Sequence, residues 1–148
     1  MFVSAKFLHL AAAIVWVGGM AFMIFVLRPI ATAQLAPPQR LPLIAAAMGR
    51  FFQLVWASIA VLLLTGLAML AGTGMKATPL GWHLMLGIGV LMMLIFGHLH
   101  FVGLRRLQRA VAASDWPAGG QAVAGIARLV HLNFGLAWLA IAAVFFIK

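Results

Sequence analysis

The chain has 148 residues, of which 66% are hydrophobic and 7% charged, and its mean hydropathy of +1.18 excludes an ordinary soluble domain, in which about a quarter of the residues are charged. Cysteine is absent, which excludes disulfides, thiolate metal sites and iron–sulfur clusters. The net charge is +9, and because the basic residues flank apolar runs, they indicate membrane topology and contact with lipid headgroups rather than nucleic acid.

The first half of the chain contains two apolar runs that are long enough to cross a bilayer, residues 4–27 and 51–71. Arg28 ends the first run. The length of this run and the positive charge at its end favour a retained helix over a cleaved signal peptide. Residues 30–49 contain three prolines and a charged arginine, so we expect a connector here rather than a continuous helix.

The second half contains two more apolar runs, residues 80–103 and 125–147. We expect the third helix to continue beyond the bilayer as a basic extension. Ser114 or Asp115 is the expected N-cap of the last helix, with a proline in its first turn. The four runs together predict one domain, residues 1–148, with an all-α fold: an integral membrane antiparallel four-helix bundle.

The basic side chains are divided unequally between the two ends of this predicted bundle. Seven arginines fall at one end: Arg28, Arg40, Arg50, Arg105, Arg106, Arg109 and Arg128. Three lysines fall at the other: Lys6, Lys76 and Lys148. The positive-inside rule therefore predicts that the arginine end is cytoplasmic and that both termini are periplasmic.

Four histidines lie one to two turns inside the ends of the apolar runs, at two depths. His9 and His83 share the level near the termini, and His98 and His131 share the level near the arginines. Two pairs of imidazoles could bind a metal ion or haem iron at these levels. The alternative is that each ring only reaches the headgroups or hydrogen-bonds a carbonyl. His100 is expected to point away from His98 and to be interfacial.

The first and last helices share a short pattern of a basic residue, a His-Leu pair and a tryptophan. The residues are Lys6, His9 and Trp16 in the first helix, and Arg128, His131 and Trp138 in the last. Because the two helices run in opposite directions, this echo suggests a repeat of inverted topology. We predict that the basic residues and the tryptophans contact a cofactor, with the two cations placed for haem propionates. The alternative is that the cations serve only as topology markers.

Two functions remain open at this point. The predicted spans contain no carboxylate that could act as a base and the chain has no nucleophilic cysteine, so a hydrolytic enzyme is not indicated. Histidine and methionine could bind and pass copper as Cu(I), for which Met20, Met23 and Met75 are candidates, the last of them in the loop after the second helix. Alternatively, the histidine pairs could hold b-type haem in a membrane cytochrome. Either function would involve a partner, such as a redox protein or a periplasmic copper protein.

Several motifs resemble those of the CopD family of bacterial inner-membrane proteins, which are named for copper resistance. They are Lys6-Phe-Leu-His9, Val15-Trp16-Val17-Gly18-Gly19-Met20, Leu27-Arg28-Pro29, Pro37-Pro38-Gln39-Arg40-Leu41-Pro42, Arg50-Phe51-Phe52, Gly97-His98-Leu99-His100-Phe101 and Asp115-Trp116-Pro117. The resemblance implies a four-helix bundle in the inner membrane and a role in copper uptake or homeostasis. The first helix is also similar to that of HemJ-type protoporphyrinogen oxidases, which are associated with haem. That similarity reaches His9 only, because the last helix lacks the Asn-Glu-Val-Pro-like segment of those enzymes.

Overall fold

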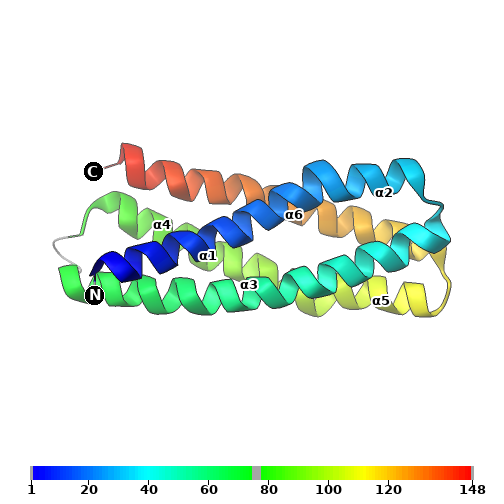
Figure 1. Cartoon of the computed structure of the whole chain (residues 1–148), viewed down its shortest axis with the longest axis horizontal. Coiled ribbons are helices and arrows are strands. Elements are labelled where there is room, and N and C mark those ends of the chain that lie inside the picture. The colour runs from blue at the N-terminus through cyan, green and yellow to red at the C-terminus, as the bar shows by residue number, and fades with distance from the viewer. Residues whose placement is uncertain (1, 75–77, 148) are drawn as a thin grey trace.

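The computed structural model describes residues 2–74 and 78–147, and it confirms the all-α, four-helix membrane fold. The elements are α1 (Phe2–Phe22), the π-helical segment η1 (Met23–Leu27), α2 (Arg28–Gln34), α3 (Pro37–Thr73), α4 (Leu80–His98), the π-helical segment η3 (Leu99–Leu104), α5 (Arg105–Ala112) and α6 (Trp116–Phe146). Four helical stretches are long and apolar enough to span a membrane: Val3–Gln34, Pro37–Thr73, Leu80–Ala112 and Trp116–Phe146. They run side by side, with the two termini at one end of the bundle (Figure 1).

The bundle consists of two helical hairpins. In the first, α1, η1 and α2 form one arm and α3 the other; in the second, α4, η3 and α5 form one arm and α6 the other. The helix α1 packs mainly against α3, and α4 packs mainly against α6. The two hairpins approach each other closely at the arginine end, where α5 and η3 reach α3, whereas α4 has few close approaches to α1 or α3. The bundle is therefore tight at one end and open inside at the other.

The segment predicted as a connector, residues 30–49, is helical except at Leu35 and Ala36, so that prediction was wrong. Its prolines are compatible with helix because two of them occupy the first turn of α3, where no amide donor is needed. Pro42 lies deeper, but the turns around it bury Leu41 and Ile44 to 1% and 2% exposure. Packing of that face outweighs the loss of one backbone hydrogen bond.

Arg28 and Pro29 likewise do not end the first helix, which continues to Gln34. The π-helical segment η1 immediately precedes them, and the Arg28 amide donates to the Met23 carbonyl five residues back. This wider turn accommodates the proline ring, which would clash with the preceding turn of a regular α-helix. A second π-helical segment, η3, occupies the corresponding place in the first arm of the second hairpin, just before Arg105.

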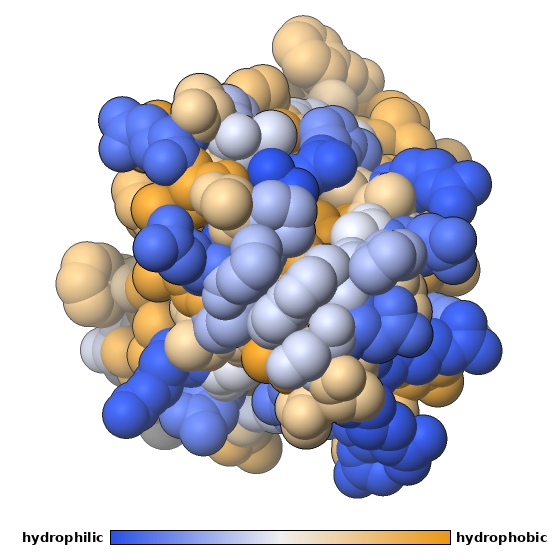
Figure 2. Space-filling model, turned by 90° about the vertical axis from the view of Figure 1, so that its right-hand side faces the viewer, coloured by the Kyte–Doolittle hydropathy of each residue, from blue (hydrophilic) through white to orange (hydrophobic). Residues whose placement is uncertain are grey.

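The expected start of the last helix and the expected basic extension of the third helix are confirmed. Asp115 is the N-cap of α6: its side chain accepts a hydrogen bond from the Ala118 amide at 3.0 Å, and a proline occupies the first turn. The basic extension of the third helix is α5, which is helical to Ala112. Hydrophilic side chains gather around this end of the bundle when it is viewed end-on (Figure 2). Of the three lysines assigned to the opposite end, Lys76 and Lys148 lie outside the described residues.

The sequence pattern shared by the first and last helices does not correspond to equivalent positions of the side chains in the structure. Trp16 is buried at 3% exposure, whereas Trp138 is 57% exposed. The inward face of α6 is instead formed by the residues Val130, Asn133, Ala137, Ala140 and Ala143. The similarity between the two halves lies in two hairpins that each enter at the termini end and turn at the arginine end, rather than in an inverted pair of helices.

Candidate functional site

A cavity of about 450 Å³ opens between the two hairpins in the half of the bundle that contains the termini. Side chains from α1, α3, α4 and α6 line it, so all four spanning helices contribute. Its walls are almost entirely apolar, and its lining includes Lys6, His9, Trp16 and Trp82. We call it the terminal cavity. It exists because α4 stands apart from α1 and α3 at this level.

His9 is the histidine of the terminal cavity, and Thr65 of α3 fixes its orientation. The ring atom Nδ1 lies 2.9 Å from the Thr65 hydroxyl oxygen. That hydroxyl donates its single proton to the Val61 carbonyl, 2.6 Å away, so it must accept from His9. The neutral ring therefore carries its proton on Nδ1, which leaves Nε2 with a free lone pair. A ring held in one tautomer by a second residue is the usual arrangement of a metal-binding histidine.

Methionines supply the other ligand-type atoms of the terminal cavity. Met69 of α3 and Met85, Met92 and Met93 of α4 all border it. Met69 and Met92 are buried, at 6% and 5% exposure. Thioether sulfur is a soft ligand that, together with imidazole, suits Cu(I). The described residues contain no group of three or more His, Cys, Asp or Glu side chains that could hold a metal ion.

The floor of the terminal cavity is a layer of buried aromatic and polar side chains in the middle of the bundle. The rings of Trp16 and Phe96 meet edge-on with centroids 6.1 Å apart. One turn below the cavity-lining Ala137, Asn133 is 1% exposed and donates from Nδ2 to the Met92 carbonyl at 3.3 Å. Its Oδ1 atom is buried without a hydrogen-bond partner. This layer separates the terminal cavity from the arginine half.

Among the residues predicted to form the site at the termini level, the structure brings three together. Lys6, His9 and Trp16 all line the terminal cavity. His83 is half-buried on α4 and does not border the cavity, although the preceding tryptophan does. Met75, a candidate ligand in the loop after the second helix, lies outside the described residues. The terminal cavity therefore contains one histidine of the predicted pair.

The residues predicted at the arginine level are more widely separated. His98, Arg128 and His131 are exposed on the outside of the bundle, as is Trp138. The ring of His131 forms a hydrogen bond within its own helix, where Nδ1 lies 2.7 Å from the Ala127 carbonyl oxygen. The structure thus places no imidazole of this predicted pair in the interior of the bundle.

His100, rather than His98, is the histidine of this region that turns toward the protein. Its ring contacts the aromatic residues Phe52, Trp56, Phe96 and Phe101, with centroid distances of 4.9 to 6.3 Å. It is half-buried, and its Nδ1 is buried without a hydrogen-bond partner. A flat imidazole ring can pack edge-on or face-on against neighbouring aromatic rings, as these rings do with one another. His100 therefore points away from the exposed His98, as expected, but its ring lies among aromatic side chains of the bundle.

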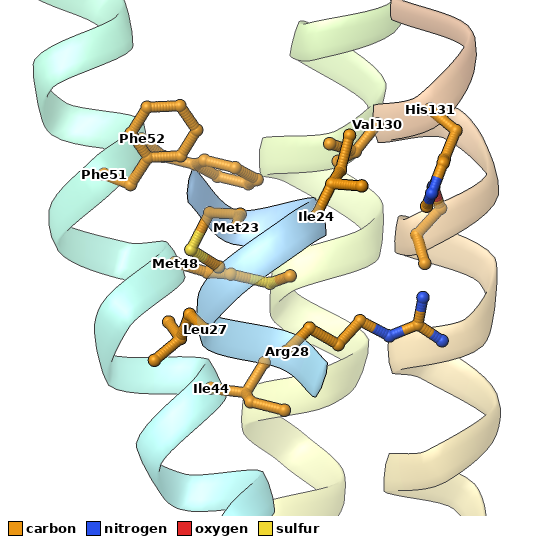
Figure 3. Close-up of a pocket in the computed structure, with 11 residues that line it drawn as sticks. Met23, Ile24, Leu27, Arg28, Ile44, Met48, Phe51, Phe52, Val130 and His131 are labelled. Atoms are coloured by element: carbon orange, nitrogen blue, oxygen red, sulfur yellow. The ribbon is translucent and has the colours of Figure 1, made fainter. Parts of the chain in front are cut away.

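A second, much smaller cavity of about 20 Å³ lies in the arginine half, between η1, α3 and α6 (Figure 3). Met23 and Met48 border it from η1 and α3, and both are buried. His131 and Arg28 form its rim on the α6 side. We call it the inner cavity. Inside this rim its walls are apolar.

Reasoning from the sequence overlooked Thr65 and undervalued the methionines of the second and third helices. Thr65 has a sequence signal, because it is one of few polar residues within the apolar run 51–71. Met85, Met92 and Met93 carry no such signal, since methionine is common in lipid-facing and core positions. Only the packing of α4 against its neighbours distinguishes them.

Comparison with known proteins gives one family. The model of the family described as CopD, copper resistance protein D, matches residues 45–147, which is more than half of the chain. The matched region includes Thr65 and the four methionines of the terminal cavity, whereas His9 precedes it. Comparisons with curated proteins and with solved structures found no match.

Proposed function

We propose that this chain, which belongs to the copper resistance protein D (CopD) family, is a copper-homeostasis protein of the bacterial inner membrane that takes up copper as Cu(I) in the terminal cavity. Copper is its cargo rather than a resident cofactor. Family membership supports the association with copper, and the four apolar spanning helices support a multi-pass membrane protein.

The observation that carries the proposal is the pairing of His9 with Thr65 beside four methionines. The hydrogen bond of 2.9 Å leaves His9 Nε2 available as a ligand. The methionines that border the same space are Met69, Met85, Met92 and Met93. Imidazole and thioether together favour Cu(I) over harder cations such as Mg²⁺ or Ca²⁺, which prefer oxygen. A transported ion must also dissociate again, and thioethers hold Cu(I) less tightly than thiolates do.

The distribution of charge supports a periplasmic opening for the terminal cavity. Arginines dominate the opposite end of the bundle, and by the positive-inside rule that end faces the cytoplasm. Both termini and the terminal cavity then lie on the periplasmic side. We infer that a periplasmic copper protein or the free ion delivers the cargo there. Lys6, at the rim of the terminal cavity, would meet an acidic patch of such a partner.

Haem is the alternative ligand to copper, and the volume of the terminal cavity is the observation that favours it. A space of about 450 Å³ exceeds what a single ion needs. Lys6 also lies at the rim beside His9, where a propionate could end. However, haem held between two histidines does not fit the geometry, because His9 is the one histidine that borders the cavity within the described chain. Copper is therefore the better-supported ligand.

The proposal is tested by titrating the purified protein with Cu(I) against a chromogenic Cu(I) chelator under anaerobic conditions. The wild type should compete with the chelator, and His9→Ala should lower the affinity at least about tenfold because a ligand is lost. His98→Ala is the matched control, since His98 is exposed and does not border the cavity, and it should bind as the wild type does. Equal affinity of all three proteins, or no binding at all, would overturn the proposal. A Soret band in the protein as isolated would favour haem instead.

A further inference from the structure

The inner cavity has the size of a single ion or water molecule. Its volume of about 20 Å³ exceeds the roughly 10–15 Å³ that one water requires. A buried water also requires two to four polar partners, and these apolar walls offer none. Water is therefore a poor occupant. The cavity is either an empty packing defect or a place for something that apolar and sulfur atoms can hold.

The soft ligand atoms beside the inner cavity are the sulfur atoms of two methionines. Met23 and Met48 are 7% and 5% exposed, and they reach toward each other from η1 and α3 (Figure 3). Met23 is the first residue of the π-helical segment η1. π-helical turns occur frequently at functional sites, where the additional residue per turn redirects side chains. A pair of buried thioethers around an ion-sized space is a soft, weakly binding site that suits Cu(I).

Histidine and arginine define the rim of the inner cavity. The Nδ1 atom of His131 donates to the Ala127 carbonyl at 2.7 Å, because a carbonyl can only accept. The neutral ring then has its lone pair on Nε2, as His9 does at the other level. Arg28 extends toward α6 near His131, and its positive charge disfavours long residence of a cation (Figure 3). Such a rim would make the inner cavity the weaker of two Cu(I) sites.

Met20 lies between the two cavities along the buried face of α1. It is 2% exposed and borders neither cavity. It is one turn from Trp16, which lines the terminal cavity, and one turn from Met23, which lines the inner cavity. Buried methionines thus occur from the terminal cavity to the arginine half. The terminal cavity and the inner cavity therefore lie one after the other along the length of the bundle.

We infer that the inner cavity is a second Cu(I) position, in which Met23 and Met48 bind the ion and His131 receives it at the rim. This inference rests on the proposed function, since it assumes that copper enters through the terminal cavity. The ion keeps its oxidation state throughout, so the step exchanges ligands without any electron transfer. The histidine expected to form a pair with His98 then acts with methionines instead.

The first experiment counts Cu(I) equivalents bound by the full chain in lipid nanodiscs. The wild type should bind two, and Met23→Leu/Met48→Leu should bind one, with the stronger site retained. Leucine nearly conserves the volume of methionine, and Met20→Leu is the matched control because Met20 is equally buried but borders neither cavity. Met20→Leu should still bind two. Two equivalents in the double variant would overturn the inference and leave the proposed function intact. A wild type that binds no copper would overturn both.

The second experiment does not depend on the folding of any variant. The wild type carrying ¹³C-methyl methionine is titrated with Ag(I), a redox-inert substitute for Cu(I), and the methyl resonances are followed. The Met23 and Met48 signals should shift together with the second equivalent, while the Met20 signal stays in place. If neither signal moves while those of the terminal cavity do, the inner cavity is a packing defect only and the inference fails.

Discussion

His9 Nδ1 and the Thr65 hydroxyl oxygen lie 2.9 Å apart, and this contact joins α1 to α3 across 56 residues of sequence. The hydroxyl is already committed to the Val61 carbonyl at 2.6 Å, so its direction is settled and so is the tautomer of the ring. One threonine in an apolar span thereby fixes the orientation of the histidine that we propose as a copper ligand. Thr65 lies in the region that the CopD family model matches, and His9 lies before it.

Removing the hydroxyl of Thr65 should weaken Cu(I) binding without unfolding the protein. Thr65→Val keeps the shape but leaves His9 Nδ1 without its acceptor, so the ring can rotate and change tautomer. Loss of such a supporting residue lowers metal affinity by about 10- to 100-fold. Thr65→Ser keeps the hydroxyl and should bind nearly as the wild type does. Competition titration with a Cu(I) chelator measures both variants, and an unchanged affinity in Thr65→Val would show that the hydroxyl does not orient His9.

The contact between α4 and α6 at the termini end should depend on a glycine. A Cβ atom on Gly81 would collide with the backbone carbonyl oxygens of Ala143 and Ile147, which cannot move aside as a flexible side chain can. Gly81→Ala should therefore destabilise the bundle by about 1–3 kcal/mol. Gly87→Ala on the same helix is the control, since a Cβ there meets nothing within 4 Å. Thermal unfolding in one detergent compares the two variants, and equal midpoints would contradict the close approach of α4 to α6.

The orientation of the bundle can be read from fusions to a reporter that is active only in the periplasm. Because the arginine end should be cytoplasmic, a fusion after Lys148 should be active and a fusion at Asp115 should be silent. The opposite pattern would invert the topology. The terminal cavity would then open to the cytoplasm, and copper would have to be collected from inside the cell.

The number and type of helices could be predicted because apolar runs of this length have few alternatives in a membrane. Which face of each helix points into the bundle could not be predicted. Helices that are apolar all round give no amphipathic signal, so nothing in the sequence distinguishes the buried Trp16 from the exposed Trp138. Depth was also a poor guide to contact: His83 matches His9 in level, yet of these two histidines only His9 borders the cavity.

Proline was the second source of error. Rules for helix breakers treat each proline in isolation, and they assigned residues 30–49 to a connector. Two prolines at the start of α3 and a π-helical segment before Pro29 make these positions compatible with helix. That extra helix buries Met48, which belongs to the inner cavity. The burial of Met23 and Met48 around one cavity therefore became visible only with the fold.

X-ray absorption at the copper edge, on protein loaded with one equivalent of Cu(I), tests the central claim most directly. A site built from His9 and methionines should give one imidazole and at least one sulfur in the coordination shell, with the edge shape of Cu(I). In His9→Ala the imidazole contribution should disappear, while His98→Ala should leave the spectrum unchanged. A shell of nitrogen and oxygen alone, or an imidazole signal that survives in His9→Ala, would contradict the assignment of the terminal cavity as the copper site.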